Sequence, residues 1–168
     1  EFENWTGSAD GDNYPNANDG DNNSGADSLV GNTGNDTIFG GNQNDTIDGQ
    51  GGQDSIEGGN HRDLIYGGTG NDWLHGRGHN DTIYGGDGND TIHGGNHVDL
   101  VYGGNGDDAI YASGGNGNDT LYGEAGNDYL NGGSNGVAST LIGGPGNDTL
   151  TGSTGTDTAK FAGNRSQY

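Results

Sequence analysis

The sequence predicts an all-β solenoid, because three features repeat along most of its length. A nine-residue unit recurs about fifteen times, and most copies carry an aspartate at their sixth position. An aliphatic residue follows each aspartate two positions later, and glycine dominates the positions before it. A fixed short period of this kind is typical of a solenoid in which each unit contacts only its neighbours.

The repeated aspartates keep one register over ten units and resume it after short insertions. They are Asp27, Asp36, Asp45, Asp54, Asp63, Asp72, Asp81, Asp90, Asp99, Asp108, Asp119, Asp128, Asp148 and Asp157. The aliphatic residues are Leu29, Ile38, Ile47, Ile56, Ile65, Leu74, Ile83, Ile92, Val101, Ile110, Leu121, Leu130 and Leu150. One unit is degenerate, with Ser139 ahead of Leu141, and the last has only Ala159.

The last three residues of each unit, such as Thr91-Ile92-His93, predict a very short strand whose middle side chain points inward. The six glycine-rich residues before them predict a turn. Two consecutive units therefore complete one coil with two strands and two turns. Aspartates two units apart align in a column on the same edge, about one strand spacing of 4.8 Å apart.

The composition makes the chain depend on a cation. Only 25% of the residues are hydrophobic, 40 are glycine and none is cysteine, which is typical of a chain that cannot fold alone. The net charge of -21 excludes nucleic acid and anionic membranes as electrostatic partners. Stacked carboxylates repel one another. We therefore expect the metal-free chain to be unfolded or molten, and metal binding to drive its folding.

The unit reads GGxGxDxUx, where U is a large aliphatic residue, and its clearest copies are 67–75 and 85–93. In this pattern the chain resembles the RTX, or haemolysin-type, calcium-binding repeat family over residues 24–160. The resemblance implies a right-handed parallel β-roll with calcium ions between successive turns. It also implies a secreted, extracellular protein that leaves the cell by type I secretion and folds in calcium outside it.

The resemblance further implies which oxygens bind each ion. One turn gives its aspartate and the carbonyls of its second and fourth positions. The turn two units later gives its aspartate and the carbonyls of its first and third positions. Carried over to one edge, this division gives about six strong sites from Asn32, Gly34, Asp36, Gly49, Gln50, Gly51, Gly52, Asp54, Gly67, Gly68, Thr69, Gly70, Asp72, Gly85, Gly86, Asp87, Gly88, Asp90, Gly103, Gly104, Asn105, Gly106, Asp108, Gly123, Glu124, Ala125, Gly126, Asp128, Gly143, Pro145 and Asp148.

The sequence also distinguishes the two edges. Edge A, which carries the aspartates just given from Asp36 to Asp148, always has glycine at the fourth position. Edge B carries Asp27, Asp45, Asp63, Asp81, Asp99 and Asp119. Its fourth positions include Gln43, His61, His79 and His97, which tolerate a left-handed backbone less well than glycine. Two insertions, near 112–113 and 134–137, also fall on edge B. We therefore expect weaker or fewer calcium sites there.

Two rows of side chains have alternative interpretations. His61, His79 and His97 should stack, as should His75 and His93, which suggests either exposed residues repeated by duplication or a zinc or copper site. Outward residues Tyr66, Tyr84, Tyr102 and Tyr122, with Leu64 and Leu100, suggest either a partner surface or a stabilising ladder. On the other sheet, outward Trp73 and Tyr129 are expected to be isolated.

The terminal segments leave the repeat. Residues 1–23 are expected to form a degenerate repeat or cap, with Trp5 and Tyr14 over the open end of the roll. Residues 161–168 are expected to begin a C-terminal flanking segment. The chain starts at Glu1 and contains no methionine, which suggests a processed product or a fragment of a longer protein.

These observations favour a non-catalytic calcium-binding module, attached to an effector domain. No group of residues has the spacing of a nucleophile or an acid–base pair, so we expect no enzyme activity. The turn threonines are too irregular for an ice-binding face. The alternative function is a fibre or surface-layer subunit that assembles end to end in calcium, because open solenoid ends expose strand edges.

Overall fold

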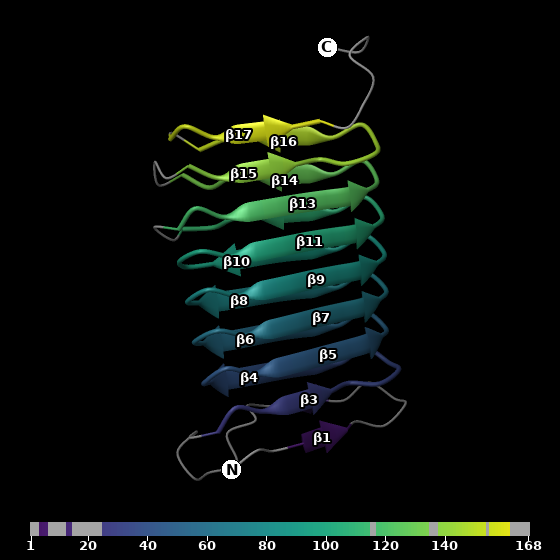
Figure 1. Cartoon of the computed structure of the whole chain (residues 1–168). Helices are drawn as coiled ribbons and strands as arrows, with labels where there is room; N and C mark the ends of the chain where they lie inside the picture. The colour runs from purple at the N-terminus through teal and green to yellow at the C-terminus, as the bar shows by residue number, and fades with distance from the viewer. Residues whose placement is uncertain are drawn as a thin grey trace.

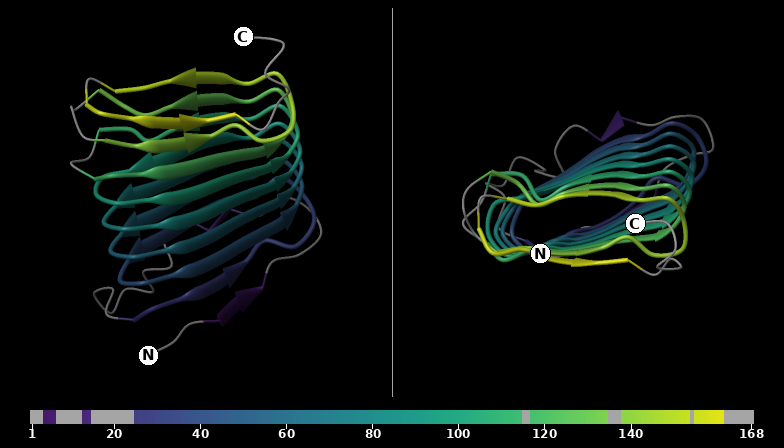
Figure 2. Two further views of the ribbon diagram at one scale, coloured as in Figure 1. Left: turned by 45° about the horizontal axis from the view of Figure 1, so that its top comes forward. Right: turned by 90° about the horizontal axis from the view of Figure 1, so that it is seen from above.

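The computed structural model contains only strands and turns in the residues that it describes, which are 25–114, 117–134, 138–153, 155–161 and the backbone of 4–6 and 13–14. Alternate strands pair in parallel to form one nine-stranded and one eight-stranded sheet. Figure 1 shows the coils stacked along one axis, and Figure 2 shows the two sheets facing each other across a flattened coil. The predicted parallel β-solenoid is confirmed. In the described part of the chain no helix is long and apolar enough to cross a membrane.

The nine-stranded sheet contains the odd-numbered strands. They are β1 (Asn4–Thr6), β3 (Ser28–Val30), β5 (Thr46–Gly51), β7 (Leu64–Thr69), β9 (Thr82–Asp87), β11 (Leu100–Asn105), β13 (Thr120–Ala125), β15 (Thr140–Ile142) and β17 (Thr158–Lys160). The eight-stranded sheet contains β2 (Asn13–Tyr14), β4 (Thr37–Asn42), β6 (Ser55–Asn60), β8 (Trp73–Gly78), β10 (Thr91–Gly95), β12 (Ala109–Tyr111), β14 (Tyr129–Asn131) and β16 (Thr149–Thr151).

The strand register confirms that two units make one coil, which contains 18 residues. Ile47 lies beside Ile65, and Ile65 beside Ile83. Where the insertions occur, the coil grows by two residues without a change of register, so that Val101 lies beside Leu121. The extra residues are accommodated in turns on edge B, and the sheets continue past them.

The core is a double column of aliphatic side chains enclosed between the two sheets. Each regular strand contributes one side chain, because the residue two places after the aspartate is the one that points inward. The predicted residues from Leu29 to Leu141 are at most 1% exposed. Ala112, in the first insertion, is also buried. The core is less well covered at its C-terminal end, where Leu150 of β16 is only partly buried and Ala159 of β17 is exposed.

The strands are longer than the sequence led us to expect. From β4 to β11 they have six residues, as in β7 and β9, or five in β10, rather than three. The pairing continues into the first half of each expected turn, where Gly41 lies beside Gly59 and Asn42 beside Asn60. Turns that stack in register align their backbone N–H and C=O groups. The parallel pairing between coils therefore continues up to the fourth position of each unit.

The N-terminal strands extend both sheets. β1 pairs with β3, and β2 pairs with β4, in parallel, but the partners are 24 residues apart, as in Trp5 and Leu29, rather than 18. This pairing agrees with a degenerate repeat at the N-terminus. The side chains of Trp5 and Tyr14 lie outside the described residues, as does the chain after Phe161. The proposed caps and domain boundaries therefore stay predictions.

Candidate metal-binding edges

The repeated aspartates lie in the turns that close the flattened coil. Edge A joins the nine-stranded sheet to the eight-stranded sheet, and edge B makes the return connection. The arrows of β5, β7 and β9 in Figure 1 point toward edge A on the right. The twelve aspartates from Asp27 to Asp128 are buried, with exposed fractions of 1–6%. Burial of so many carboxylates is costly unless their charge is compensated.

A hydrogen-bonded ladder fixes one oxygen of each carboxylate. The backbone N–H of Asp36 donates to Oδ1 of Asp54, one coil later, at 2.8 Å. On edge B the N–H of Asp45 donates to Oδ1 of Asp63 at 2.9 Å. The same bond recurs along both columns at 2.8–3.1 Å. Each coil therefore positions the carboxylate of the next coil.

The second oxygen of these carboxylates has no such partner. Among the described residues, Oδ2 is buried and accepts no hydrogen bond in Asp45, Asp54, Asp63, Asp72, Asp81, Asp90, Asp99, Asp108 and Asp128. A buried, unpaired carboxylate oxygen is destabilising unless it is protonated or bound to a cation. Both edges therefore present a column of oxygens that a hard cation would stabilise.

The unpaired oxygens face the glycine that starts their own unit. A Cβ placed on Gly49 would lie 2.5 Å from Oδ2 of Asp54 and 2.5 Å from the carbonyl oxygen of Gly67. A Cβ on Gly67 would likewise lie 2.6 Å from Oδ2 of Asp72 and 2.6 Å from the carbonyl oxygen of Gly85. A side chain at the first position would therefore fill the space between the carboxylate of its own unit and the first-position carbonyl of the next coil.

These oxygens are part of the ligand sets that the family resemblance implies. Asp54 and Gly67, for example, belong to one expected site. The third-position carbonyl of that site, from Thr69, accepts a hydrogen bond of 2.9 Å from the N–H of Gly52, which leaves one lone pair for a metal. Nowhere in the described chain do three His, Asp or Glu side chains come together around a possible metal. Main-chain oxygens would thus complete any site, as calcium permits.

Burial raises the pKa of the column aspartates from Asp45 to Asp128, although the ladder N–H groups oppose the shift. On edge B the pKa of Asp63 and of Asp81 rises to about 8. On edge A the pKa of Asp54 and of Asp72 rises to about 6. The two edges overlap, because the pKa of Asp108 on edge A rises to about 7 and that of Asp119 on edge B only to about 6. The contrast therefore concerns the central coils, where Asp63 and Asp81 are harder to ionise without a cation than Asp54 and Asp72.

The fourth position separates the two edges, as the sequence predicted. On edge A its glycines have φ of 126–157°. A Cβ on Gly70 would overlap the carbonyl oxygen of Gly52, so no other residue fits there. On edge B, Gln43 and the three histidines have φ of 76–81°, a left-handed conformation that a side chain can adopt.

The fifth position carries a second ladder that sequence reasoning missed. On edge A the side-chain oxygen of Asn71 accepts the N–H of Asn89 at 2.8 Å, and Oδ1 of Asn89 accepts the N–H of Asp107 at 2.9 Å. On edge B, Asn44 accepts the N–H of Arg62 at 3.1 Å and Asn80 that of Val98 at 3.2 Å. Arg62 and Val98 cannot repeat the bond, so this ladder is interrupted at every second coil.

The aromatic rows lie on the outer surfaces of the roll. Tyr66, Tyr84, Tyr102 and Tyr122 stack with ring centroids 4.7–5.1 Å apart. His61, His79 and His97 stack at 5.1 Å. These two predicted stacks are confirmed, whereas the stack predicted for His75 and His93 is wrong, because their rings are tilted by 52°. The expected isolation of Trp73 and Tyr129 is wrong, because Trp73 meets His75 edge-on at 5.7 Å and Tyr129 tilts against Tyr111 at 5.8 Å.

Comparisons with known proteins agree with this geometry. The family model for the RTX calcium-binding nonapeptide repeat, which spans four copies, matches residues 21–56, 57–92, 75–110, 111–136 and 138–159. No curated protein matches the chain significantly. The matched segments cover most of the chain and contain every aspartate of both columns. The chain therefore belongs to the RTX calcium-binding nonapeptide repeat family.

Proposed function

We propose that this chain is a non-catalytic extracellular module that folds when it binds calcium after secretion. The supporting observation is the pair of aspartate columns, in which nine of the described carboxylates between Asp45 and Asp128 have a buried Oδ2 that accepts no hydrogen bond. Calcium favours six to eight oxygen ligands and accepts backbone carbonyls as well as carboxylates. Family membership supports calcium as the ion and secretion as the route.

Folding depends on the ion because the metal-free roll has a narrow core and closely spaced carboxylates. Each regular strand buries one aliphatic side chain, and the carboxylates around this narrow core repel one another. Their raised pKa values have the same meaning, because ionising them in the folded chain is unfavourable. A divalent ion between successive carboxylates reverses that penalty, so the free energy of binding becomes free energy of folding.

Edge A holds the strong sites in this proposal. Successive aspartates from Asp36 to Asp148 define six intervals between coils, and glycine occupies every fourth position there. Edge B has the same carboxylates, but its fourth position has a different backbone conformation and its turns carry the insertions. We assign edge B weaker or fewer ions.

Calcium titration of the metal-stripped chain tests the function directly. Far-UV circular dichroism should show a cooperative coil-to-β transition near millimolar calcium, and a chelator should reverse it. A chain that is already β-rich without calcium, and unchanged by it, would contradict the proposal. Light scattering on the same sample tests the alternative, a self-assembling fibre or layer, because assembly would raise the scattering in step with folding.

A further inference from the structure

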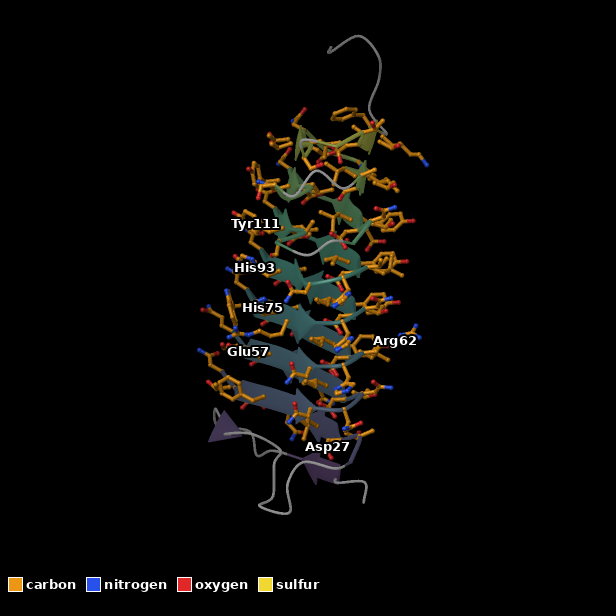
Figure 3. The ribbon with its side chains drawn as sticks, turned by 90° about the vertical axis from the view of Figure 1, so that its left-hand side faces the viewer. Asp27, Glu57, Arg62, His75, His93 and Tyr111 are labelled. Carbon is orange, nitrogen blue, oxygen red and sulfur yellow. The ribbon has the colours of Figure 1, made fainter. Side chains whose placement is uncertain are left out.

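The five histidines form two rows that differ in ring geometry. His61, His79 and His97 form a row on edge B, where neighbouring rings are inclined by 12° and 7°. His75 and His93 lie on β8 and β10 and point out from the eight-stranded sheet, with their rings inclined by 52°. Figure 3 shows Glu57, His75, His93 and Tyr111 following one another along this face.

Ring inclination decides whether two imidazoles can share a metal ion. The lone pair of an imidazole nitrogen lies in the ring plane, so a bound metal lies in that plane as well. Stacked rings have nearly parallel planes that do not meet near the nitrogens, which excludes a shared ion in the edge row. The inclined planes of His75 and His93 cross each other, and one ion can lie in both.

The separation of the rings also suits one ion. A metal bound at about 2.0–2.1 Å from an imidazole nitrogen lies about 3.2 Å from the ring centroid. The centroids of His75 and His93 are 5.5 Å apart. Two such distances meeting at one ion enclose an angle of about 120°, close to the tetrahedral preference of zinc.

Neighbouring side chains support the pair. Ser113 Oγ lies 3.4 Å from Nδ1 of His93, so the hydroxyl can accept a hydrogen bond from Nδ1–H and leave Nε2 as the metal ligand. Arg77 is the nearest basic side chain, and it is held by Glu57 at 2.8 Å. Burial lowers the pKa of both histidines, that of His75 to about 4, with Arg77 contributing. Both imidazoles are therefore neutral at pH 7 and can bind a metal without losing a proton.

We propose that His75 and His93 bind one transition-metal ion, Zn²⁺ or Cu²⁺, on the outer face of the eight-stranded sheet. Imidazole selects these ions over calcium, which prefers oxygen ligands. The site is thus separate from both aspartate columns. Water completes the coordination, because no third His, Asp or Glu side chain among the described residues reaches the pair.

Copper titration of the full chain in saturating calcium tests the site. The Trp73 ring lies 5.7 Å from His75 and 6.1 Å from His93, so Cu²⁺ should quench its fluorescence at one equivalent. Electron paramagnetic resonance should report two nitrogen ligands. His75→Gln and His93→Gln should each raise the Cu²⁺ dissociation constant by at least about tenfold. Trp73→Phe should remove the quenching and keep the two-nitrogen spectrum.

His79→Gln is the matched control, because it removes an imidazole from the stacked row and should leave copper affinity unchanged. Circular dichroism in calcium confirms that every variant is folded, so a loss of copper binding cannot be mistaken for a failure to fold. Copper affinity that persists in the His75→Gln/His93→Gln double variant overturns the proposal. An equal loss in His79→Gln overturns it as well.

Discussion

Edge A and edge B carry the same column of buried aspartates on different turns. On edge A the fourth position is closed to every residue but glycine, and the fifth-position ladder is unbroken from Asn71 to Asn147. On edge B the fourth position accepts glutamine or histidine, the ladder is interrupted, and the coil absorbs two insertions. The aspartate column requires only the Oδ1 ladder, which both edges have. The surrounding turn can therefore vary on one edge without loss of the roll.

The largest expected difference comes from the fourth position. Gly70→Ala should destabilise the calcium-loaded protein by about 3–5 kcal/mol, because its Cβ would overlap the carbonyl of Gly52 in a backbone region that favours glycine. His79→Gly on edge B should cost about 1 kcal/mol or less. Urea unfolding in calcium measures both changes. Similar losses in the two variants would mean that the edges do not differ at this position.

A second comparison uses the carboxylates. Asp72→Asn keeps the Oδ1 acceptor and replaces Oδ2 with an amide nitrogen, which repels a cation. Asp72 borders two of the proposed edge A sites, so the calcium midpoint for folding should rise by at least about tenfold. Asp81→Asn, the matched change on edge B, should shift it less. Calorimetry can count the calcium ions bound by each variant. If Asp81→Asn loses more ions than Asp72→Asn, the strong sites lie on edge B instead.

The third prediction concerns pH in the absence of calcium. The folded pKa of the column aspartates from Asp45 to Asp128 is raised above the value of 3.8 expected in the unfolded chain. The folded state therefore binds more protons, and its stability is greatest below about pH 4 and is lost as the pH rises through 6 to 8. With a chelator present, circular dichroism should show more β-structure at pH 4 than at pH 8.

Calcium should reverse that dependence, because only ionised carboxylates bind it. Affinity should fall as the pH drops through 8 toward 6, and the central sites at Asp63 and Asp81 should lose their ions before those at Asp54 and Asp72, because their pKa values are higher. Carbon-13 NMR of the Asp63 and Asp54 carboxyl groups can follow the order. If Asp63 and Asp54 take up protons at the same pH, the predicted order of calcium loss is wrong.

The smallest expected effect restores a missing hydrogen bond. Val98 is 48% exposed and interrupts the fifth-position ladder of edge B. Val98→Asn supplies an acceptor for the next coil and should stabilise the protein by about 0.5–1.5 kcal/mol. Asn89→Ala on edge A should cost a similar amount, because it leaves the N–H of Asp107 without its acceptor. Thermal unfolding in calcium compares the pair.

The repeat made much of this structure predictable. The period located the inward column from Leu29 to Leu141, because alternation along a strand leaves only one side chain per short strand in the core. It also placed the aspartates on two edges and identified Gln43 as a residue in a left-handed conformation.

Features that depend on a neighbouring coil escaped prediction. The strands extend into the turns because stacked turns pair with each other, as at Gly41 and Gly59, and nothing within one unit reveals this. Ala112 joined the core through an insertion outside the repeat pattern. The contact of Trp73 with His75 and of Tyr111 with Tyr129 crosses repeat positions, so a search within one position missed it.

The pairing of each coil only with its two neighbours has a mechanical consequence. A pulling force on either end of the chain would detach the outermost coil without disturbing those beneath it, since its ladder bonds are loaded first. Each detached regular coil would lengthen the tether by about 60 Å. The protein should therefore yield in equal steps under load, and calcium concentration should set the force of each step.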